Sequence, residues 1–352
     1  MTPVSATAAT TKDSSRAIAT WLFACAAAVF LMAIIGAVTR LTESGLSIVE
    51  WAPVKGALPP LNAADWQREF DLYKQTPQYL KVNRGMSLDE FKDIYFWEWL
   101  HRLWGRIIGL IYALPLAYFW LRGRIPAEAK PPLLGILALG FAQGLMGWLM
   151  VKSGLVDMPA VSHYRLAAHL MLAFLIYACL LRMGLAFSLR PSPDAGRGAG
   201  LRGGIKIVLA LAVLTMIWGA FVAGLRAGLL YNTFPMMDAH WLPPELWAHK
   251  PVWKAFIEEP ATVQFTHRVL AILTVVSGLW LFARARGFDL QGRAGTLFRL
   301  LPWALLAQAA LGVTALLHAV PVALGAVHQG GALVVLSLLV WLLFEIPDIR
   351  SN

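Results

Sequence analysis

Residues 19–39 read ATWLFACAAAVFLMAIIGAVT and carry no charged side chain. A transmembrane α-helix needs about 20 predominantly apolar residues, so this run predicts a helix that crosses a bilayer. A polar tail with Lys12 and Arg16 precedes it. The run is too long and too uniformly apolar for the core of a cleaved signal peptide, so we expect an uncleaved membrane anchor.

Comparable apolar runs recur along the chain. We place seven more spans at residues 98–121, 132–151, 164–186, 205–225, 262–284, 297–317 and 322–345. Of the 352 residues, 58% are hydrophobic and only 14% are charged, and the mean hydropathy is +0.61. A soluble domain carries about a quarter charged residues. The sequence therefore predicts an all-α polytopic membrane protein with eight transmembrane helices.

The formal net charge is +10, and many of the basic residues lie in the connections between these spans. The short connections after even-numbered spans are basic, with Arg122, Arg124, Lys130, Arg182, Arg190, Arg197, Arg202, Lys206, Arg284, Arg286, Arg293 and Arg299. The positive-inside rule puts these connections and both termini in the cytoplasm or the mitochondrial matrix, and the long connections 40–97 and 226–261 on the outer side. The charge is thus a topology signal, and we expect a lipid bilayer and no nucleic acid as partner.

The two halves of the chain are similar in sequence. IGAVTRLTESGL at 35–46 aligns without gaps to WGAFVAGLRAGL at 218–229, and AQGLMG at 142–147 aligns to AQAALG at 307–312. Each half also contains a histidine followed by an arginine at the start of its second span. Each half has four spans, so the two repeats share one orientation in the membrane. The pattern predicts two four-helix bundles related by a pseudo-twofold axis along the membrane normal.

This duplication divides the chain into five segments. They are a cytoplasmic tail at 1–18, an N-terminal bundle at 19–186, a basic linker at 187–204, a C-terminal bundle at 205–345 and a short tail at 346–352. Within the first bundle, two small-xxx-small pairs, Gly105 with Gly109 and Gly140 with Gly144, predict close approach between helices.

Four histidines occupy corresponding positions in the two halves. His101 and His169 lie near the starts of spans 2 and 4, and His267 and His328 near the starts of spans 6 and 8. All four therefore lie at a similar depth, on the outer side of the membrane. Zinc takes about four ligands, and no cysteine or carboxylate is spaced to complete such a site. Two opposed imidazoles in an apolar bundle suit the axial positions of a haem, so we expect one haem site in each half.

The two haem sites differ in charge. A capping box formed by Ser87 and Glu90 predicts that a helix begins near Leu88 and runs into span 2, which puts Glu98 and His101 on one helical face. The residue three before His267 is Gln264. A carboxylate accepts protons and an amide does not, so Glu98 is a candidate catalytic residue. Pairing of Glu98 with Arg102 or Arg106 at the membrane surface is an equally open interpretation.

Other polar side chains near the histidines leave alternatives open. Arg165 lies one turn before His169 and is a candidate contact for a haem propionate, while its counterpart in the repeat is Leu324. Arg102 and Arg268 follow histidines and are further candidates for propionate contacts, although snorkelling toward lipid headgroups explains them equally well. Gln143 and Gln308, repeated inside spans 3 and 7, either bond across helices or face the porphyrins.

Several stretches are similar to a known family. GAVTRLTESGLSIVEWAPVKGALPP, FWEWLHRLWGR, RLAAHL, QFTHR and GAVHQ occur in this order, and the chain resembles the haem A synthases of cytochrome oxidase assembly over nearly its whole length. The resemblance implies oxidation of the C8 methyl group of haem O to the formyl group of haem A, with oxygen from water. It implies that His101 and His169 bind the substrate haem, that Glu98 is catalytic, and that His267 and His328 bind a haem B cofactor.

The resemblance also suggests partners and a location. We expect the bacterial inner membrane, with haem O as substrate, contact with a haem O synthase, an unidentified electron acceptor and a candidate homo-oligomer. Some members carry a cysteine pair in the first outer loop, but the only cysteines here, Cys25 and Cys179, lie inside spans. The chain therefore resembles the cysteine-lacking branch of the family, which is typical of proteobacteria and mitochondria. The main rival is a di-haem b-type electron-transfer subunit, which explains the histidines but not the lone glutamate. A transporter predicts broken helices at mid-membrane, which the sequence does not favour.

Overall fold

The computed structural model describes residues 4–50, 55–154, 161–190, 196–247 and 250–347. Eight helices in these ranges are long and apolar enough to cross a membrane, which confirms the predicted number. They are α1 (Val4–Leu41), α4 (Leu88–Leu121), α5 (Lys130–Gly154), α6 (His163–Ser188), α7 (Arg202–Gly224), α9 (Pro260–Ala285), α10 (Gly292–Leu317) and α11 (Val322–Glu345). Each contains most or all of one predicted span, because in lipid a helix satisfies its backbone polar groups internally.

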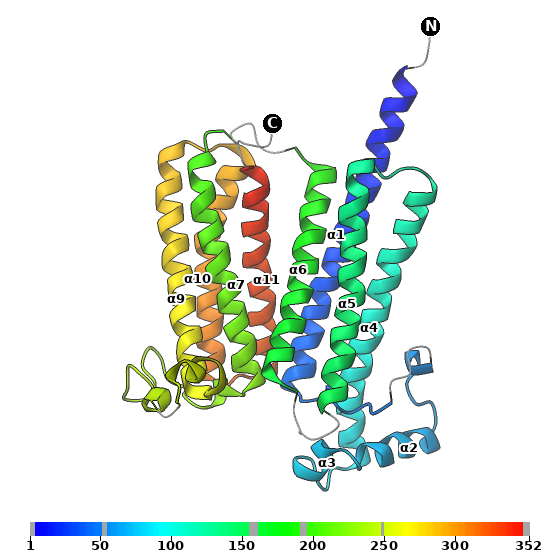
Figure 1. Ribbon diagram of the computed structural model, residues 1–352, viewed down its shortest axis with the longest axis vertical. Helices are drawn as coiled ribbons and strands as arrows, with labels where there is room; N and C mark the ends of the chain where they lie inside the picture. The colour runs from blue at the N-terminus through cyan, green and yellow to red at the C-terminus, as the bar shows by residue number, and fades with distance from the viewer. Residues whose placement is uncertain (1–3, 51–54, 155–160, 191–195, 248–249, 348–352) are drawn as a thin grey trace.

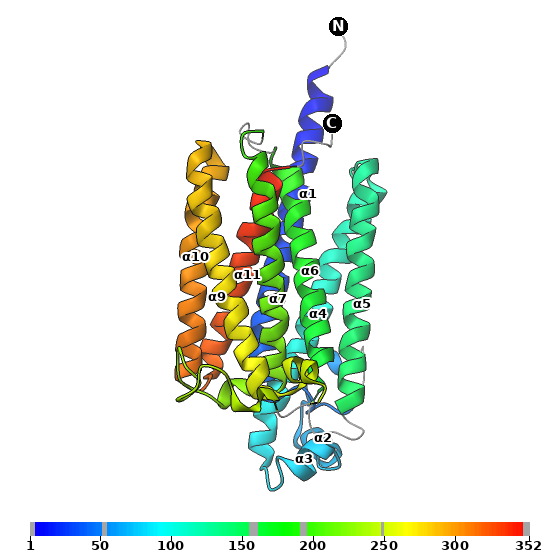
Figure 2. The same ribbon diagram turned by 60° about the vertical axis from the view of Figure 1, so that its left-hand side comes forward.

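The eight helices pack in two groups (Figures 1 and 2). In the N-terminal group, α1 packs on α4 and α6, and α5 packs on α6. In the C-terminal group, α7 packs on α9 and α11, and α10 packs on α9 and α11. The groups meet where α1 lies against α11, and where α6 lies against α7 and α11. Each group contains the four helices of one predicted bundle. The origin of the two bundles by duplication stays a prediction.

Hydrogen bonds from aromatic side chains tie the N-terminal group together. Trp21 Nε1 on α1 donates to the carbonyl of Ile111 on α4 at 2.9 Å, and Trp104 Nε1 on α4 donates to Ala28 on α1 at 2.9 Å. The Tyr112 hydroxyl donates to the carbonyl of Leu133 on α5 at 2.7 Å. Lipid gives no hydrophobic drive for helix association, so such bonds, worth about 0.6 kcal/mol each, act together with close packing.

The first outer loop folds onto the extended start of α4. The short helices α2 (Ala63–Tyr73) and α3 (Pro77–Lys81) lie at the end of the molecule opposite to both termini (Figure 1). Buried aromatic side chains of α2 stack on those of α4, with ring centroids 5.0 Å apart for Phe70 and Phe91, and Tyr79 of α3 packs on Phe70 of α2. The capping box of Ser87 and Glu90 is present, which confirms the predicted start of α4. This packing fixes the outer loop above the N-terminal group.

The glycine pairs predicted to bring helices together do so at one position of four. A Cβ atom added at Gly105 would lie 3.5 Å from Met32 on α1. At Gly109, Gly140 and Gly144 a Cβ atom would meet nothing within 4 Å. The prediction is wrong for these three glycines, because a four-residue spacing places two glycines on one face without telling what that face meets.

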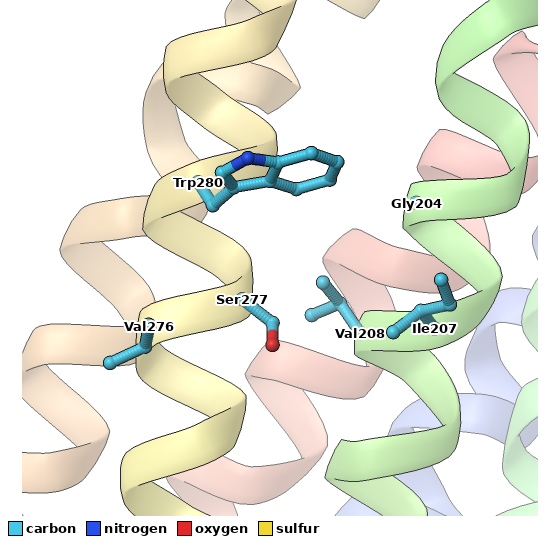
Figure 3. A pocket seen from close by; sticks show the side chains of 6 residues that line it. All are labelled: Gly204, Ile207, Val208, Val276, Ser277 and Trp280. Atoms are coloured by element: carbon cyan, nitrogen blue, oxygen red, sulfur yellow. The ribbon is translucent and has the colours of Figure 1, made fainter.

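An apolar groove runs between α7 and α9 (Figure 3). Its lining residues are Gly204, Ile207, Val208, Val276, Ser277 and Trp280. Trp280 follows His267 by about 20 Å along α9 at 1.5 Å per residue, so the groove is separate from the histidines. The side chains of Ile207, Val276 and Trp280 are exposed, as expected for a lipid-facing surface.

Candidate functional site

Two of the predicted ligands lie together in the N-terminal group. His101 on α4 and His169 on α6 have ring centroids 6.5 Å apart, with an angle of 44° between the ring planes. Both residues are half-buried. Among the described residues, no group of three or more His, Cys, Asp or Glu lies together as metal ligands. These imidazoles therefore form a pair without further ligand-type side chains around them.

The second predicted pair is His267 on α9 and His328 on α11, both in the C-terminal group. Nδ1 of His267 lies 3.0 Å from the backbone carbonyl oxygen of Thr215 on α7. A carbonyl can only accept, so this contact assigns the ring proton to Nδ1 and leaves Nε2 as the acceptor nitrogen. A histidine that donates in this way to a carbonyl is oriented as a metal ligand usually is.

The two repeated glutamines bond across helices. Nε2 of Gln143 on α5 lies 3.2 Å from Nε2 of His169, and Nε2 of Gln308 on α10 lies 3.2 Å from Nδ1 of His328. Gln308 also donates to the backbone carbonyl of His328 at 2.9 Å. Of the two interpretations that the sequence left open, the structure therefore shows contact with the histidine of the fourth helix in each group.

Several polar atoms beside the histidines are buried without a hydrogen-bond partner. They are Oε1 of Gln143, Nδ1 of His169 and Oε1 of Gln308. Leaving such groups unpaired costs about 1–3 kcal/mol each, so they cluster where a ligand or water is normally bound. Their position beside both histidine pairs supports a binding role for each pair.

Glu98 is buried and faces the first outer loop. Its carboxylate accepts hydrogen bonds from Ser47 Oγ and from the backbone N–H of Ile48, both at 2.8 Å. It also accepts one from Arg102 at 2.6 Å. Arg102 donates in turn to the carbonyl of Ile48 at 2.9 Å. Of the pairings considered from the sequence, the structure thus shows Glu98 with Arg102, and it adds a loop contact that the sequence analysis missed.

The corresponding residues of the second half hold the second outer loop with the opposite hydrogen-bond polarity. Gln264 is buried and its Nε2 donates to the carbonyls of Ala227 and Tyr231, at 2.9 and 3.2 Å. Its Oε1 accepts from Arg268 at 3.2 Å, and Arg268 donates to the carbonyl of Thr233 at 2.9 Å. Glu98 therefore accepts from its loop, whereas Gln264 donates to its loop.

The arginines that were predicted to contact haem propionates donate hydrogen bonds to main-chain carbonyls. Arg102 donates to the carbonyl of Ile48 and Arg268 donates to that of Thr233, both in the outer loops. Arg165 is exposed and donates to the carbonyl of Leu149 on α5 at 3.3 Å. Their role toward a propionate stays a prediction. Of the other histidines, His163, His240 and His318 lie outside the two pairs, and His249 lies outside the described residues.

Ser47 is the residue of this site that sequence reasoning did not single out. Its hydroxyl bonds to Glu98, although the two residues are far apart in the chain. The sequence feature that could have identified Ser47 is its place in the TESGLSIVEW stretch, the most distinctive part of the first outer loop.

Comparison with known proteins identifies the family of this chain. A family model described as cytochrome oxidase assembly protein matches residues 19–340. A haem A synthase of Rhodospirillum centenum is 52% identical over 335 residues, which cover 93% of this chain and 88% of that protein. Haem A synthases of Nitrosospira multiformis and Parvibaculum lavamentivorans are each 48% identical, and the alignments cover 94% of this chain and 93% and 94% of those proteins. The chain belongs to the haem A synthase family of cytochrome oxidase assembly proteins.

Proposed function

We propose that this protein oxidises the C8 methyl group of haem O to the formyl group of haem A. In this proposal His101 and His169 bind the substrate haem in the N-terminal group. His267 and His328 bind a haem B cofactor in the C-terminal group. The observation that carries the proposal is the separation of 6.5 Å between the first two imidazoles.

This separation fits one metal atom between the two rings. Two metal–nitrogen bonds of about 2 Å each, together with half a ring on either side, fill such a distance. A porphyrin supplies the remaining four nitrogen ligands of its iron, so two histidines are sufficient. The unpaired buried atoms of Gln143 and Gln308 support a bound group beside each pair.

The overall reaction requires water and an electron acceptor. One methyl group and one water give one formyl group, four protons and four electrons. His267 and His328 would hold haem B, which would supply one-electron oxidation and reduction when bound. The second histidine pair orients that cofactor, and its own half of the protein carries no carboxylate at the position of Glu98.

Glu98 is the residue that we propose to accept protons. It lies three residues before His101 on α4, about one helical turn away, and its side chain is buried. Ser47 and Arg102 hold the carboxylate at a fixed position. Gln264 occupies the corresponding position in the other half and has no basic oxygen of this kind.

The proposal includes a location. With the basic connections and both termini at one end of the helices, the positive-inside rule puts that end in the cytoplasm of a bacterial inner membrane. Both histidine pairs then lie toward the periplasmic side. Haem O would reach the site from the membrane, where a haem O synthase is the expected source.

Pigment analysis of purified protein tests the ligand assignments. Pyridine-haemochrome spectra of the wild type should contain haem B together with haem O or haem A. The variant His101→Ala should keep haem B and lose the other haems, and His267→Ala should lose haem B. A wild type with haem B alone in both halves would favour the rival electron-transfer subunit and contradict the proposal.

A further inference from the structure

Each of the four imidazoles lies against a glycine of a neighbouring helix. His101 faces Gly36 on α1, and His169 faces Gly147 on α5. In the C-terminal group, His267 faces Gly219 on α7 and His328 faces Gly312 on α10. In both groups, therefore, a glycine on the first helix meets the histidine of the second, and a glycine on the third helix meets the histidine of the fourth.

The glycines recur at equivalent positions of the two halves. Gly36 and Gly219 are the second residues of the aligned stretches IGAVTRLTESGL and WGAFVAGLRAGL. Gly147 and Gly312 are the last residues of AQGLMG and AQAALG. Gly144, one turn from Gly147, has an alanine as its counterpart in the second half. Gly45 and Gly228 are also equivalent in the first alignment, but they meet Thr39 and Val320, so equivalence together with an imidazole neighbour is what the four glycines share.

Glycine at these four positions is explained by the close approach of an imidazole ring to the helix backbone, and not by the conformational freedom of glycine. All four lie inside helices without the positive φ that favours glycine. Alanine is a better helix former than glycine at such positions, so a glycine there weakens the helix unless a neighbour needs the space. The neighbour in each case is the imidazole, because it contains the atom nearest to where a Cβ would lie.

The space left for a Cβ atom differs between the two groups. A Cβ at Gly36 would lie 3.4 Å from Nε2 of His101, and one at Gly147 would lie 3.3 Å from Cε1 of His169. In the C-terminal group the distances fall to 3.1 Å from His267 at Gly219 and 2.8 Å from His328 at Gly312. The imidazoles of the C-terminal group are therefore packed more tightly on backbone.

We propose that Gly36, Gly147, Gly219 and Gly312 are positioning residues for the four axial histidines, and that the tighter contacts at Gly219 and Gly312 fix the cofactor pair more rigidly. The looser contacts at Gly36 and Gly147 leave the substrate pair freer to adjust when one haem replaces another. This inference rests on the proposed function, because it assigns a retained haem to one pair and an exchanging haem to the other.

Four glycine-to-alanine variants of the full-length protein test the proposal. Haem B loss from detergent-purified protein is followed by transfer to an excess of apomyoglobin. Contacts that orient a metal ligand typically change metal affinity by about 10-fold to 100-fold, so G312A should lose haem B faster by about that range. G219A should show a smaller acceleration, and G36A and G147A should lose haem B at the wild-type rate.

G144A is the matched control, because a Cβ at Gly144 meets nothing within 4 Å. Circular dichroism and gel filtration report whether each variant is folded, and the optical spectrum of the oxidised protein reports a displaced ligand before haem is lost. If G312A does not accumulate, G219A gives the same measurement with the smaller displacement. Failure of G219A to accumulate would count against the proposal, because moving one ring should not unfold the bundle.

The outcome separates this inference from the proposed function. A wild type that binds haem B through His267, with G312A and G219A losing it at the wild-type rate, overturns the positioning role alone. Equal acceleration in all four variants overturns the difference between the two groups. A wild type without haem B at His267 overturns both proposals.

Discussion

Arg40 on α1 donates a hydrogen bond to the carbonyl oxygen of Ala223 on α7 at a distance of 2.8 Å. These two residues are equivalent in the alignment of 35–46 with 218–229. Glu43 and Arg226, which form an ion pair, are equivalent in the same alignment. Equivalent positions contact each other where a twofold axis passes between two copies, so these contacts support the proposed pseudo-twofold arrangement.

Replacing Arg40 with alanine should destabilise the contact between the groups more than replacing Glu43. Arg40 bonds to the carbonyls of Ala223 and Gly224 at the end of α7, and losing such charge-assisted bonds costs about 1.5–3 kcal/mol. The pair of Glu43 with Arg226 is partly exposed, so E43A should cost less than about 1 kcal/mol. Thermal unfolding in detergent measures both, and equal losses of stability would contradict the expected order.

Two substitutions separate the chemical role of Glu98 from its contact with the outer loop. E98Q should abolish conversion of haem O to haem A while haem binding survives, because an amide does not accept the released protons. S47A removes one bond to Glu98, worth about 1–2 kcal/mol, and leaves the carboxylate in place. Activity of S47A should therefore stay within about 30-fold of the wild type, since 1.4 kcal/mol is about tenfold.

Product haem from both variants is quantified by chromatography of extracted pigments. Limited proteolysis of the intact protein reports whether the first outer loop has loosened. Full activity in E98Q would rule out the proton-accepting role. Equal loss of activity in S47A and E98Q, with equal loosening of the loop, would mean that Glu98 acts only by holding the loop.

The reciprocal substitution Gln264→Glu should weaken the second outer loop. The amide of Gln264 donates to the carbonyls of Ala227 and Tyr231, and a carboxylate at this position cannot donate to either. Each carbonyl would lose one donor and keep another, the N–H of Leu230 for Ala227 and Arg268 for Tyr231, so the cost is about 0.5–1.5 kcal/mol for each lost bond. Thermal unfolding should show a lower midpoint for Q264E than for the wild type, and an unchanged midpoint would contradict the assigned hydrogen bonds.

Gln308 and Gln143 should differ in their effect on retained haem. Gln308 contacts both the ring and the backbone carbonyl of His328, whereas Gln143 contacts His169 in the other group. Replacement Q308L should weaken haem B binding by about 10-fold to 100-fold, as loss of a ligand-orienting contact typically does. Q143L should leave haem B in place, and a haem B spectrum altered in Q143L but not in Q308L would reverse the assignment.

The sequence predicted the fold of this protein closely. Runs such as 19–39 specify helices that cross a bilayer, because backbone groups in lipid must be satisfied within the helix. The start of α4 at Leu88 followed from Ser87 and Glu90 alone, since a capping box is a local structure. The common depth of the four histidines in the membrane stays a prediction, which rests on the fixed rise per residue of a helix.

The sequence did not predict the rotation of each helix about its axis, which decides which neighbour each face meets. Gly109, Gly140 and Gly144 were expected to meet neighbouring helices and meet open space instead, while Gly219 and Gly312 meet imidazole rings. Spacing along one helix tells which residues share a face. Only packing among several helices decides which partner that face meets.

The sequence by itself determined eight membrane helices, the start of α4, and the repeated histidines with a glutamate in one half and a glutamine in the other. Only the tertiary structure decided that Glu98 and Gln264 face outer loops with opposite hydrogen-bond polarity, and that a glycine lies against each imidazole. The physical reason is range: helix formation in lipid depends on neighbours within a few residues, whereas these contacts join segments whose relative positions are fixed by the packing of the whole bundle.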